Sequence, residues 1–418
     1  MRISELGPGA TAAEIRALTP DPRDVEHDVR AIVDAVRIGG DRTLVEYTER
    51  FDGVAVPVDR LCVDSGDVDA AVASLDADVA DGLRTAIENV RTVAEAQLRD
   101  ATTVDLEDGQ HVEIADLAVR RAGAYVPAGR ASYPSTVVMA TVPARVAGVD
   151  EIALCAAPGP DGEIDPVILG ACGLCGVDEI YRVGGAQAVA ALAYGTDVIR
   201  PVDVIAGPGN AWVQEAKRQV AGVVAIDGIA GPSELVVVAD GGAEPEPLVL
   251  DLLAQAEHGP DSLVAMISTD RDLLSAIGVA VARMAPERPS VCDAPLALVR
   301  VADAAAAVRL ADAIAPEHLQ LVGSDVEALA PTVRAAGCLF VGAQAATAFG
   351  DYVAGSNHIL PTGGAGRFQS SVSPATFRRR MARVSFPGEA AARLAAKGAP
   401  LARAEGFPVH AESMERRA

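Results

Sequence analysis

Two short segments each place a histidine beside a residue that could share chemistry with it. In QAEHG, His258 follows Gln255 by three residues, so on a helix the amide oxygen and the imidazole would share a face and could chelate one metal ion. A histidine near a helix end is more often only a favourable C-terminal residue, because the helix dipole attracts positive charge there. The spacing alone leaves both interpretations open.

The second segment is APEHLQL, with adjacent Glu317 and His318 directly after Pro316. At a turn both side chains could face one pocket and supply two proton acceptors to a reaction that must remove more than one proton. The alternative is a helix N-terminus, where proline and glutamate are favoured in the first turn. By itself the pair favours that structural alternative.

Two further segments carry isolated polar groups of the same kinds. GDYVAGSNHILPTGG contains Asp351 and His358 in a glycine-rich stretch that could bring backbone close to a ligand, or could be only a turn-rich connection. EGFPVHAES contains Glu405 and His410 close to the C-terminus, where a frayed tail is the usual interpretation.

Glycine-rich turns also follow predicted strands. VDVIAGPGNAWVQEAKR reads as strand, turn and helix, and it matches only the first half of a dinucleotide fingerprint because Trp212 stands where the third glycine would be. YRVGGAQAVAALAYGT leads a strand tightly into a helix, and IDGIAGPSEL adds a turn that presents Ser233 and Glu234. As a nucleotide motif each is weak.

The elements that must position these groups follow an α/β pattern. Valines and isoleucines on one stripe predict a helix ending near Gly39, and a second long helix is expected over 83–98. From about residue 112, short apolar strands alternate with helices, which indicates parallel sheets with covering helices. We therefore predict two Rossmann-like α/β lobes with parallel sheets, and helical extensions at both ends.

Composition limits the partners. The 418 residues include 58 acidic and 35 basic side chains, a net charge of -23, which argues against nucleic acid and anionic membranes as partners and suits a cytoplasm at high salt. No apolar run approaches ~18 residues, and the N-terminus lacks the pattern of a secretory signal, so we expect a cytoplasmic protein. The pair Cys172 and Cys175 is expected to be buried rather than metal-binding or redox-active, because no second CxxC motif accompanies it.

Taken together, the segments resemble the histidinol dehydrogenase family over almost the whole chain. The strings that carry the resemblance occur in the family's order: AYVPAGRASYPSTVVM, VGGAQAVAALAYGT, GPGNAWVQEAKR, IDGIAGPSE, QAEHGPDS, APEHLQL and GDYVAGSNHILPTGG. The resemblance implies a zinc-dependent enzyme that oxidises L-histidinol to L-histidine via the aldehyde with two NAD, in the last steps of histidine biosynthesis. It also implies a homodimer in which the C-terminal tail reaches into the neighbour's site.

The resemblance implies roles at matching positions, and one position departs from the family. The implied zinc ligands are Gln255, His258, Asp351 and His410. The implied bases are Glu317 and His318, and the implied substrate contacts are Ser233, His358, Glu405, His318 and the four zinc ligands. Tyr125, Gln187 and Asn210 match positions that contact the nicotinamide cofactor. The family often has a glutamate where this chain has Thr347, which puts one carboxylate near the substrate in doubt.

With these roles we expect four parts: an N-terminal helical extension at 1–25, a zinc-binding catalytic lobe at 26–120 and 236–372, a nucleotide-contacting lobe at 121–235, and a C-terminal helical tail at 373–418.

Three alternatives remain. The first is a related zinc and NAD dehydrogenase that acts on another small alcohol. The second is a zinc-binding protein without catalysis, which the retained Glu317 and His318 disfavour. The third is a zinc hydrolase, which is disfavoured because HExxH is absent.

Overall fold

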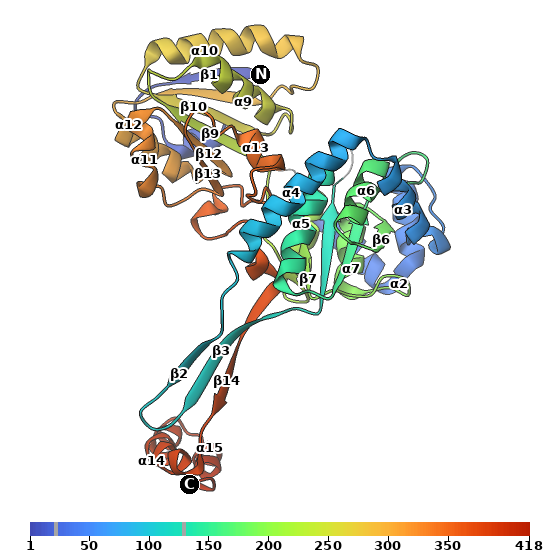
Figure 1. Cartoon of the computed structure of the whole chain (residues 1–418), viewed down its shortest axis with the longest axis vertical. Helices are drawn as coiled ribbons and strands as arrows, with labels where there is room; N and C mark the ends of the chain where they lie inside the picture. The colour runs from blue at the N-terminus through green and yellow to red at the C-terminus, as the bar shows by residue number, and fades with distance from the viewer. Residues whose placement is uncertain (21–23, 128–130) are drawn as a thin grey trace.

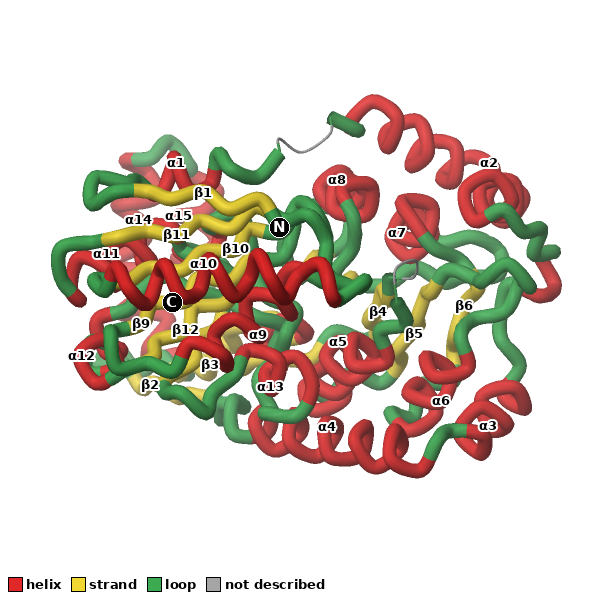
Figure 2. Tube along the Cα trace, turned by 90° about the horizontal axis from the view of Figure 1, so that it is seen from above, coloured by secondary structure: helices red, strands yellow, loops and turns green. Residues whose placement is uncertain are grey.

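The computed structural model describes residues 1–20, 24–127 and 131–418. Within these residues the chain forms two parallel sheets flanked by helices and a narrow antiparallel arm that carries two helices at its end (Figure 1). Seen from above, the two lobes lie side by side (Figure 2). The predicted pair of α/β lobes with parallel sheets is confirmed.

The first lobe is built on a five-stranded parallel sheet with the order β6-β5-β4-β7-β8. Its first strand in the chain, β4, lies next to the fourth, β7, which is the strand order of a doubly wound nucleotide-binding fold. The strands are β4 (Arg121–Val126), β5 (Glu151–Ala156), β6 (Glu179–Arg182), β7 (Val204–Ala206) and β8 (Ala225–Ile226). The helices are α2 (Glu26–Asp52), α3 (Ser65–Ser74), α4 (Ala77–Glu95), α5 (Pro134–Ala147), α6 (Pro166–Leu174), α7 (Gly185–Tyr194) and α8 (Ala211–Val220).

The second lobe repeats this plan on a six-stranded parallel sheet with the order β1-β11-β10-β9-β12-β13. Its strands are β1 (Arg2–Leu6), β9 (Glu234–Ala239), β10 (Leu263–Ser268), β11 (Pro295–Arg300), β12 (His318–Val322) and β13 (Cys338–Val341). Its helices are α1 (Ala12–Arg16), α9 (Pro245–Ala256), α10 (Arg271–Met284), α11 (Ala304–Ile314), α12 (Ser324–Glu327) and α13 (Thr347–Tyr352). Strands β9 and β10 are buried at every position, as expected for strands covered by helices on both faces.

The N-terminal segment differs from the predicted helical extension at 1–25. Arg2–Leu6 form a strand that pairs in parallel with β11 at the sheet edge, and only the short helix α1 follows among residues 1–20. Residues 21–23 of that extension lie outside the described residues. A short edge strand is half exposed and therefore lacks the apolar run that would have indicated it in the sequence.

The expected lobe boundary also differs. Helices α2, α3 and α4 pack against α7, α6 and α5, so residues 26–95 belong with the five-stranded sheet and not with the six-stranded one. The apolar stripe of α2 identified a buried face correctly, but a stripe does not specify which sheet the helix covers. Cys172 is packed in this same core, as predicted, and Cys175 is half-buried beside it.

The C-terminal tail is only partly helical. Arg378–Ser385 form β14, which pairs antiparallel with β3 (His111–Ala118), and β2 (Thr102–Asp105) completes a three-stranded arm. Helices α14 (Gly388–Ala404) and α15 (Pro408–Glu415) lie at the end of this arm, away from both lobes (Figure 1). Among the described residues, every helix is too short or too polar to cross a bilayer.

Candidate active site

The Glu-His pair lies at the connection between helix α11 and strand β12. Helix α11 ends at Ile314, Ala315 takes a left-handed backbone conformation with φ of 50°, and His318 begins β12. A strand rather than a helix follows Pro316, which rules out the helix N-terminus considered for this segment. Glu317 and His318 are both buried, with 7% and 2% exposure.

Glu317 is held by two donors on one carboxylate oxygen. Ser233 Oγ donates to Oε2 at 2.6 Å, and the backbone N–H of Glu234 donates to the same oxygen at 2.8 Å. Burial disfavours the charged carboxylate more than these donors and His318 favour it, and it raises the pKa of Glu317 to about 7. Glu317 can therefore both accept and release a proton near neutrality.

His318 is oriented through both ring nitrogens. Nδ1 lies 3.2 Å from the carbonyl oxygen of Glu234, and Nε2 lies 3.6 Å from Oδ1 of Asp351. A carbonyl oxygen can only accept, so Nδ1 carries a proton and Nε2 is the basic nitrogen. Burial opposes the charged ring, but Glu317 and Asp351 outweigh it and raise the pKa of His318 to about 9. A divalent cation on Asp351 would compensate that carboxylate and favour the neutral imidazole.

Three of the four predicted zinc ligands lie beside this pair. Gln255 is near the end of α9, His258 follows that helix in a turn, and Asp351 lies on α13. Gln255 Nε2 donates to Ser233 Oγ at 2.7 Å, so its metal-binding atom would be Oε1. Desolvation lowers the pKa of His258. Burial alone would raise the pKa of Asp351, but His318 and the other nearby histidines lower it.

A neutral imidazole, a carboxylate and an amide oxygen are donors that zinc accepts, so these residues fit the metal. Within residues 1–20, 24–127 and 131–418, no group of three or more His, Cys, Asp or Glu side chains could hold a metal ion by itself. A complete zinc site here would depend on the amide of Gln255 and on a donor from elsewhere.

His358 connects this site with the other lobe. Its Nδ1 lies 2.8 Å from the carbonyl oxygen of Asp351, and its Nε2 lies 3.1 Å from Oγ1 of Thr136 on α5. Asn357 Nδ2 donates to the carbonyl oxygen of Met139 on the same helix at 2.7 Å. The site therefore lies where the two lobes meet. Thr136 was not identified from the sequence, because nothing in its segment distinguishes it from an ordinary helix residue.

Glu405 and His410 are not brought to this site within one chain. Glu405 caps the C-terminus of α14 and His410 lies on α15, and both helices are at the far end of the arm (Figure 1). Thr347, noted in the sequence as a departure from the family pattern, is buried, and its Oγ1 has no hydrogen-bond partner among the residues that the structure describes.

The three predicted cofactor contacts gather at the carboxyl edge of the five-stranded sheet. The hydroxyl of Tyr125 on β4 accepts from the backbone N–H of Gly185 at 3.1 Å. Gln187 on α7 is buried, and among the described residues neither atom of its amide has a hydrogen-bond partner. Asn210 is the N-cap of α8 and accepts from the backbone N–H groups of Trp212 and Val213.

This edge lies beside β4 and β7, where the strand order reverses and where ligands bind in open α/β sheets. A buried amide without a partner is costly, so the Gln187 amide, which has none within the described part of the chain, fits a polar ligand at this edge.

The fold and the site together define a two-lobed α/β protein with a buried acid–imidazole pair where its doubly wound lobes meet. The chain belongs to the histidinol dehydrogenase family, whose model, described as histidinol dehydrogenase, matches residues 17–418. It is 42% identical over 409 residues to a histidinol dehydrogenase of Gluconobacter oxydans, covering 96% of this chain and 95% of that protein. It is 43% identical over 415 residues to one of Rhodospirillum rubrum, covering 98% of this chain and 95% of that protein.

A solved structure agrees with this assignment. The crystal structure of histidinol dehydrogenase from Elizabethkingia anophelis matches the fold with a TM-score of 0.91 at 30% identity, over 100% of this chain and 98% of that one. The resemblance noted in the sequence is thereby confirmed.

Proposed function

We propose that this chain oxidises L-histidinol to L-histidine through the aldehyde, with two NAD as electron acceptors and zinc as cofactor. The observation that carries the proposal is the buried pair Glu317 and His318, which lies beside Asp351 and, through Ser233, beside Gln255. Membership of the histidinol dehydrogenase family supports the same reaction.

In the proposed mechanism the two bases divide the proton transfers. In the first oxidation, Nε2 of His318 takes the hydroxyl proton of the alcohol. Glu317 then takes a proton from the water that adds to the aldehyde carbon, which gives the hydrate. His318 releases that first proton to solvent before the second oxidation, in which its Nε2 takes a hydroxyl proton of the hydrate. NAD, held by Tyr125, Gln187 and Asn210, would supply the acceptor for the hydride that leaves the same carbon in each oxidation.

The zinc would be held by Oε1 of Gln255, by His258 and by Asp351, with His410 of the partner subunit as the fourth ligand. Bound zinc would orient the substrate nitrogens and polarise its oxygen. Ser233, His358, His318 and Glu405 of the partner subunit would complete the substrate contacts, together with the zinc ligands. Tyr125, Gln187 and Asn210 would contact the nicotinamide cofactor.

The supply of two residues from the partner subunit requires a homodimer with exchanged tails, and the arm supports this. Its strands and terminal helices expose large apolar side chains that a monomer would leave in water: Val104, Leu106, Val384, Phe386, Leu401, Phe407 and Val409. Placing α14 and α15 on a second copy would bury the apolar side chains that these two helices expose. We further infer a cytoplasmic enzyme whose net charge of -23 suits high salt and disfavours nucleic acid and membranes as partners.

The test is the yield of NADH from L-histidinol, NAD and zinc with purified protein. Two NADH per substrate, abolished by a chelator and restored by zinc, is the expected result. One NADH, or none, would favour the related dehydrogenase of another small alcohol, for which the buried Thr347 in place of a carboxylate is the specific observation.

A further inference from the structure

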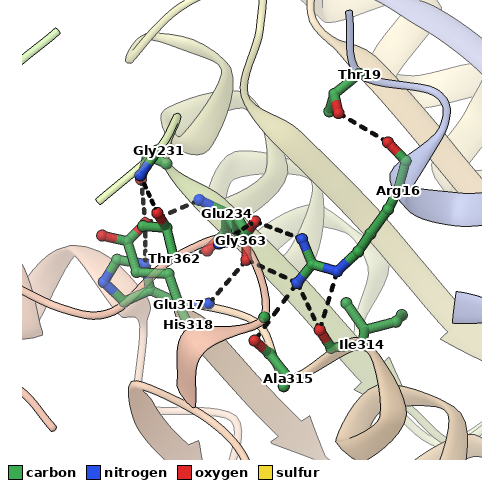
Figure 3. A network of polar contacts seen from close by, with 12 residues as sticks. Arg16, Thr19, Gly231, Glu234, Ile314, Ala315, Glu317, His318, Thr362 and Gly363 are labelled. Atoms are coloured by element: carbon green, nitrogen blue, oxygen red, sulfur yellow. Dashed lines mark hydrogen bonds and ion pairs between the residues drawn. The ribbon is translucent and has the colours of Figure 1, made fainter. Parts of the chain in front are cut away.

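An ion pair that involves the N-terminal segment lies beside the proposed bases (Figure 3). Arg16, the last residue of α1, donates to both carboxylate oxygens of Glu234, at 2.7 Å to Oε1 and 3.2 Å to Oε2. The side chain of Glu234 is 6% exposed and that of Arg16 is 27% exposed. A carboxylate this deeply buried needs a positive partner, and the fork of a guanidinium also fixes its orientation.

The same guanidinium holds the turn that leads to the bases. Its Nε donates to the carbonyl oxygen of Ile314 at 3.2 Å, a second nitrogen donates to that oxygen at 2.5 Å, and Ala315 accepts at 3.5 Å. Ala315 is the one non-glycine residue with a left-handed φ in the described part of the chain. Because alanine disfavours that conformation, the surroundings must stabilise the turn. Arg16 therefore stabilises the backbone two residues before Glu317.

Glu234 in turn contacts both bases with three different groups. Its carboxylate accepts from the backbone N–H of Glu317 at 3.3 Å, and its own N–H donates to the Glu317 carboxylate at 2.8 Å. Its carbonyl oxygen accepts from Nδ1 of His318 at 3.2 Å. Gly363 adds an N–H to the Glu234 carboxylate at 2.9 Å, which closes the network on the other side.

We propose that Arg16 and Glu234 are positioning residues that hold the carboxylate of Glu317 in place and keep His318 in the tautomer with its proton on Nδ1. This inference rests on the proposed function, in which Nε2 of His318 is the base. Neither residue touches the substrate: Arg16 orders Glu234 and the turn at Ala315, and Glu234 orders the two bases. The rate of proton transfer depends on this order, whereas zinc binding through Gln255, His258 and Asp351 does not.

The test compares the variants Arg16→Met, Arg16→Lys and Glu234→Gln in the zinc-loaded enzyme. Arg16→Met keeps an apolar stem and removes every donor, and kcat should fall by about 10- to 100-fold, the usual effect of losing a partner that orients a functional group. KM for L-histidinol and the zinc content should stay close to those of the unaltered enzyme. Arg16→Lys keeps the charge but not the fork, so it should recover only part of kcat.

A second readout does not depend on turnover. The chain has six histidines, so nitrogen NMR of protein labelled in its imidazole rings is simple, and His318→Ala assigns the His318 signals. In the zinc-loaded state, the unaltered protein should give the Nδ1-protonated pattern at His318, whereas Arg16→Met and Glu234→Gln should give a mixture of tautomers. The matched control is Arg42→Met, which breaks the exposed ion pair with Glu46 and should change neither readout.

The inference is overturned if kcat stays within about twofold in Arg16→Met and Glu234→Gln, or if the His318 tautomer is unchanged in both. It is also overturned if kcat falls only in proportion to lost zinc or lost folded protein, because that is a purely structural effect. Should Arg16→Met fail to fold, Arg16→Lys and Glu234→Gln decide alone. Absence of NADH production by the unaltered enzyme would instead contradict the proposed function.

Discussion

A buried ion pair next to the glycine-rich turn after β7 offers a sharp test of the packing in the first lobe. Lys217 on α8 and Asp227 form an ion pair, with side-chain exposures of 1% and 4%. Both side chains also bind the backbone of Gly207. Lys217 Nζ donates to the carbonyl oxygen of Gly207 at 3.0 Å, and the N–H of Gly207 donates to Asp227 at 2.8 Å. The pair therefore holds the turn that leads to Asn210. The perturbation is Lys217→Met, which preserves the apolar stem and removes the charge.

The expected loss of stability follows from the burial of the remaining partner. Removing one member of a buried ion pair costs about 3–5 kcal/mol, because the other charge stays in an environment that cannot solvate it. Replacing both members removes that uncompensated charge. In Lys217→Met with Asp227→Asn, the new amide oxygen can still accept from Gly207, so most of the lost stability should return.

The assay is urea unfolding followed by tryptophan fluorescence. Trp212 is the only tryptophan of the chain and lies on the same helix as Lys217, so its emission reports on this lobe. With a urea dependence of about 1–3 kcal/mol per molar, the midpoint of Lys217→Met should fall by at least about 1 M. Arg42→Met, which breaks an exposed pair on α2, is the control and should hardly move it. A midpoint for Lys217→Met that matches this control would refute the reasoning.

The remaining predictions concern the proposed reaction and one acidic group. His318→Ala should slow both oxidations by at least about 100-fold, whereas Glu317→Ala should chiefly slow the second, measured as oxidation of supplied aldehyde; an unimpaired aldehyde reaction would remove the role given to Glu317. His410→Ala should lose zinc, measured by metal analysis, and mixing it with inactive His318→Ala should restore part of the activity; retained zinc or no rescue would contradict the exchanged tail. Burial raises the pKa of Asp52 to about 6, so ionisation of this carboxyl destabilises the folded state at higher pH. Asp52→Asn should therefore raise the melting temperature above about pH 6. The gain should disappear below about pH 4, where the carboxyl is protonated in both the folded and the unfolded state.

The residue types of the site could be identified in the sequence because each short motif contains two functional residues within a few positions of each other. Gln255 and His258 are three residues apart, and Glu317 and His318 are adjacent, so local chain geometry already keeps each pair close. The resemblance to the family was what linked these separate pairs. Taken singly, each pair was better explained by an ordinary helix end or turn.

Strand and helix content was also readable, because burial on both faces requires continuous apolar strands and amphipathic helices have a periodic stripe. The sheet to which an element belongs was not readable. Strand β1 was not predicted because an edge strand is half exposed and has no apolar run. Residues 26–95 were assigned to the wrong lobe because the apolar stripe of a helix does not specify which sheet the helix covers.

The sequence by itself therefore determined the donor types, their local spacing and the α/β class of this protein, since these depend on neighbours along the chain. Only the tertiary structure decided that Ser233 and Glu234, which precede or begin β9, contact the Glu-His pair at the start of β12. Only the tertiary structure brings Arg16 into contact with Glu234, which is 218 residues away in the chain. It also places Thr136 against His358 where the two lobes meet. The physical reason is that parallel pairing and lobe packing join segments far apart in sequence, and no local pattern records which segments these are.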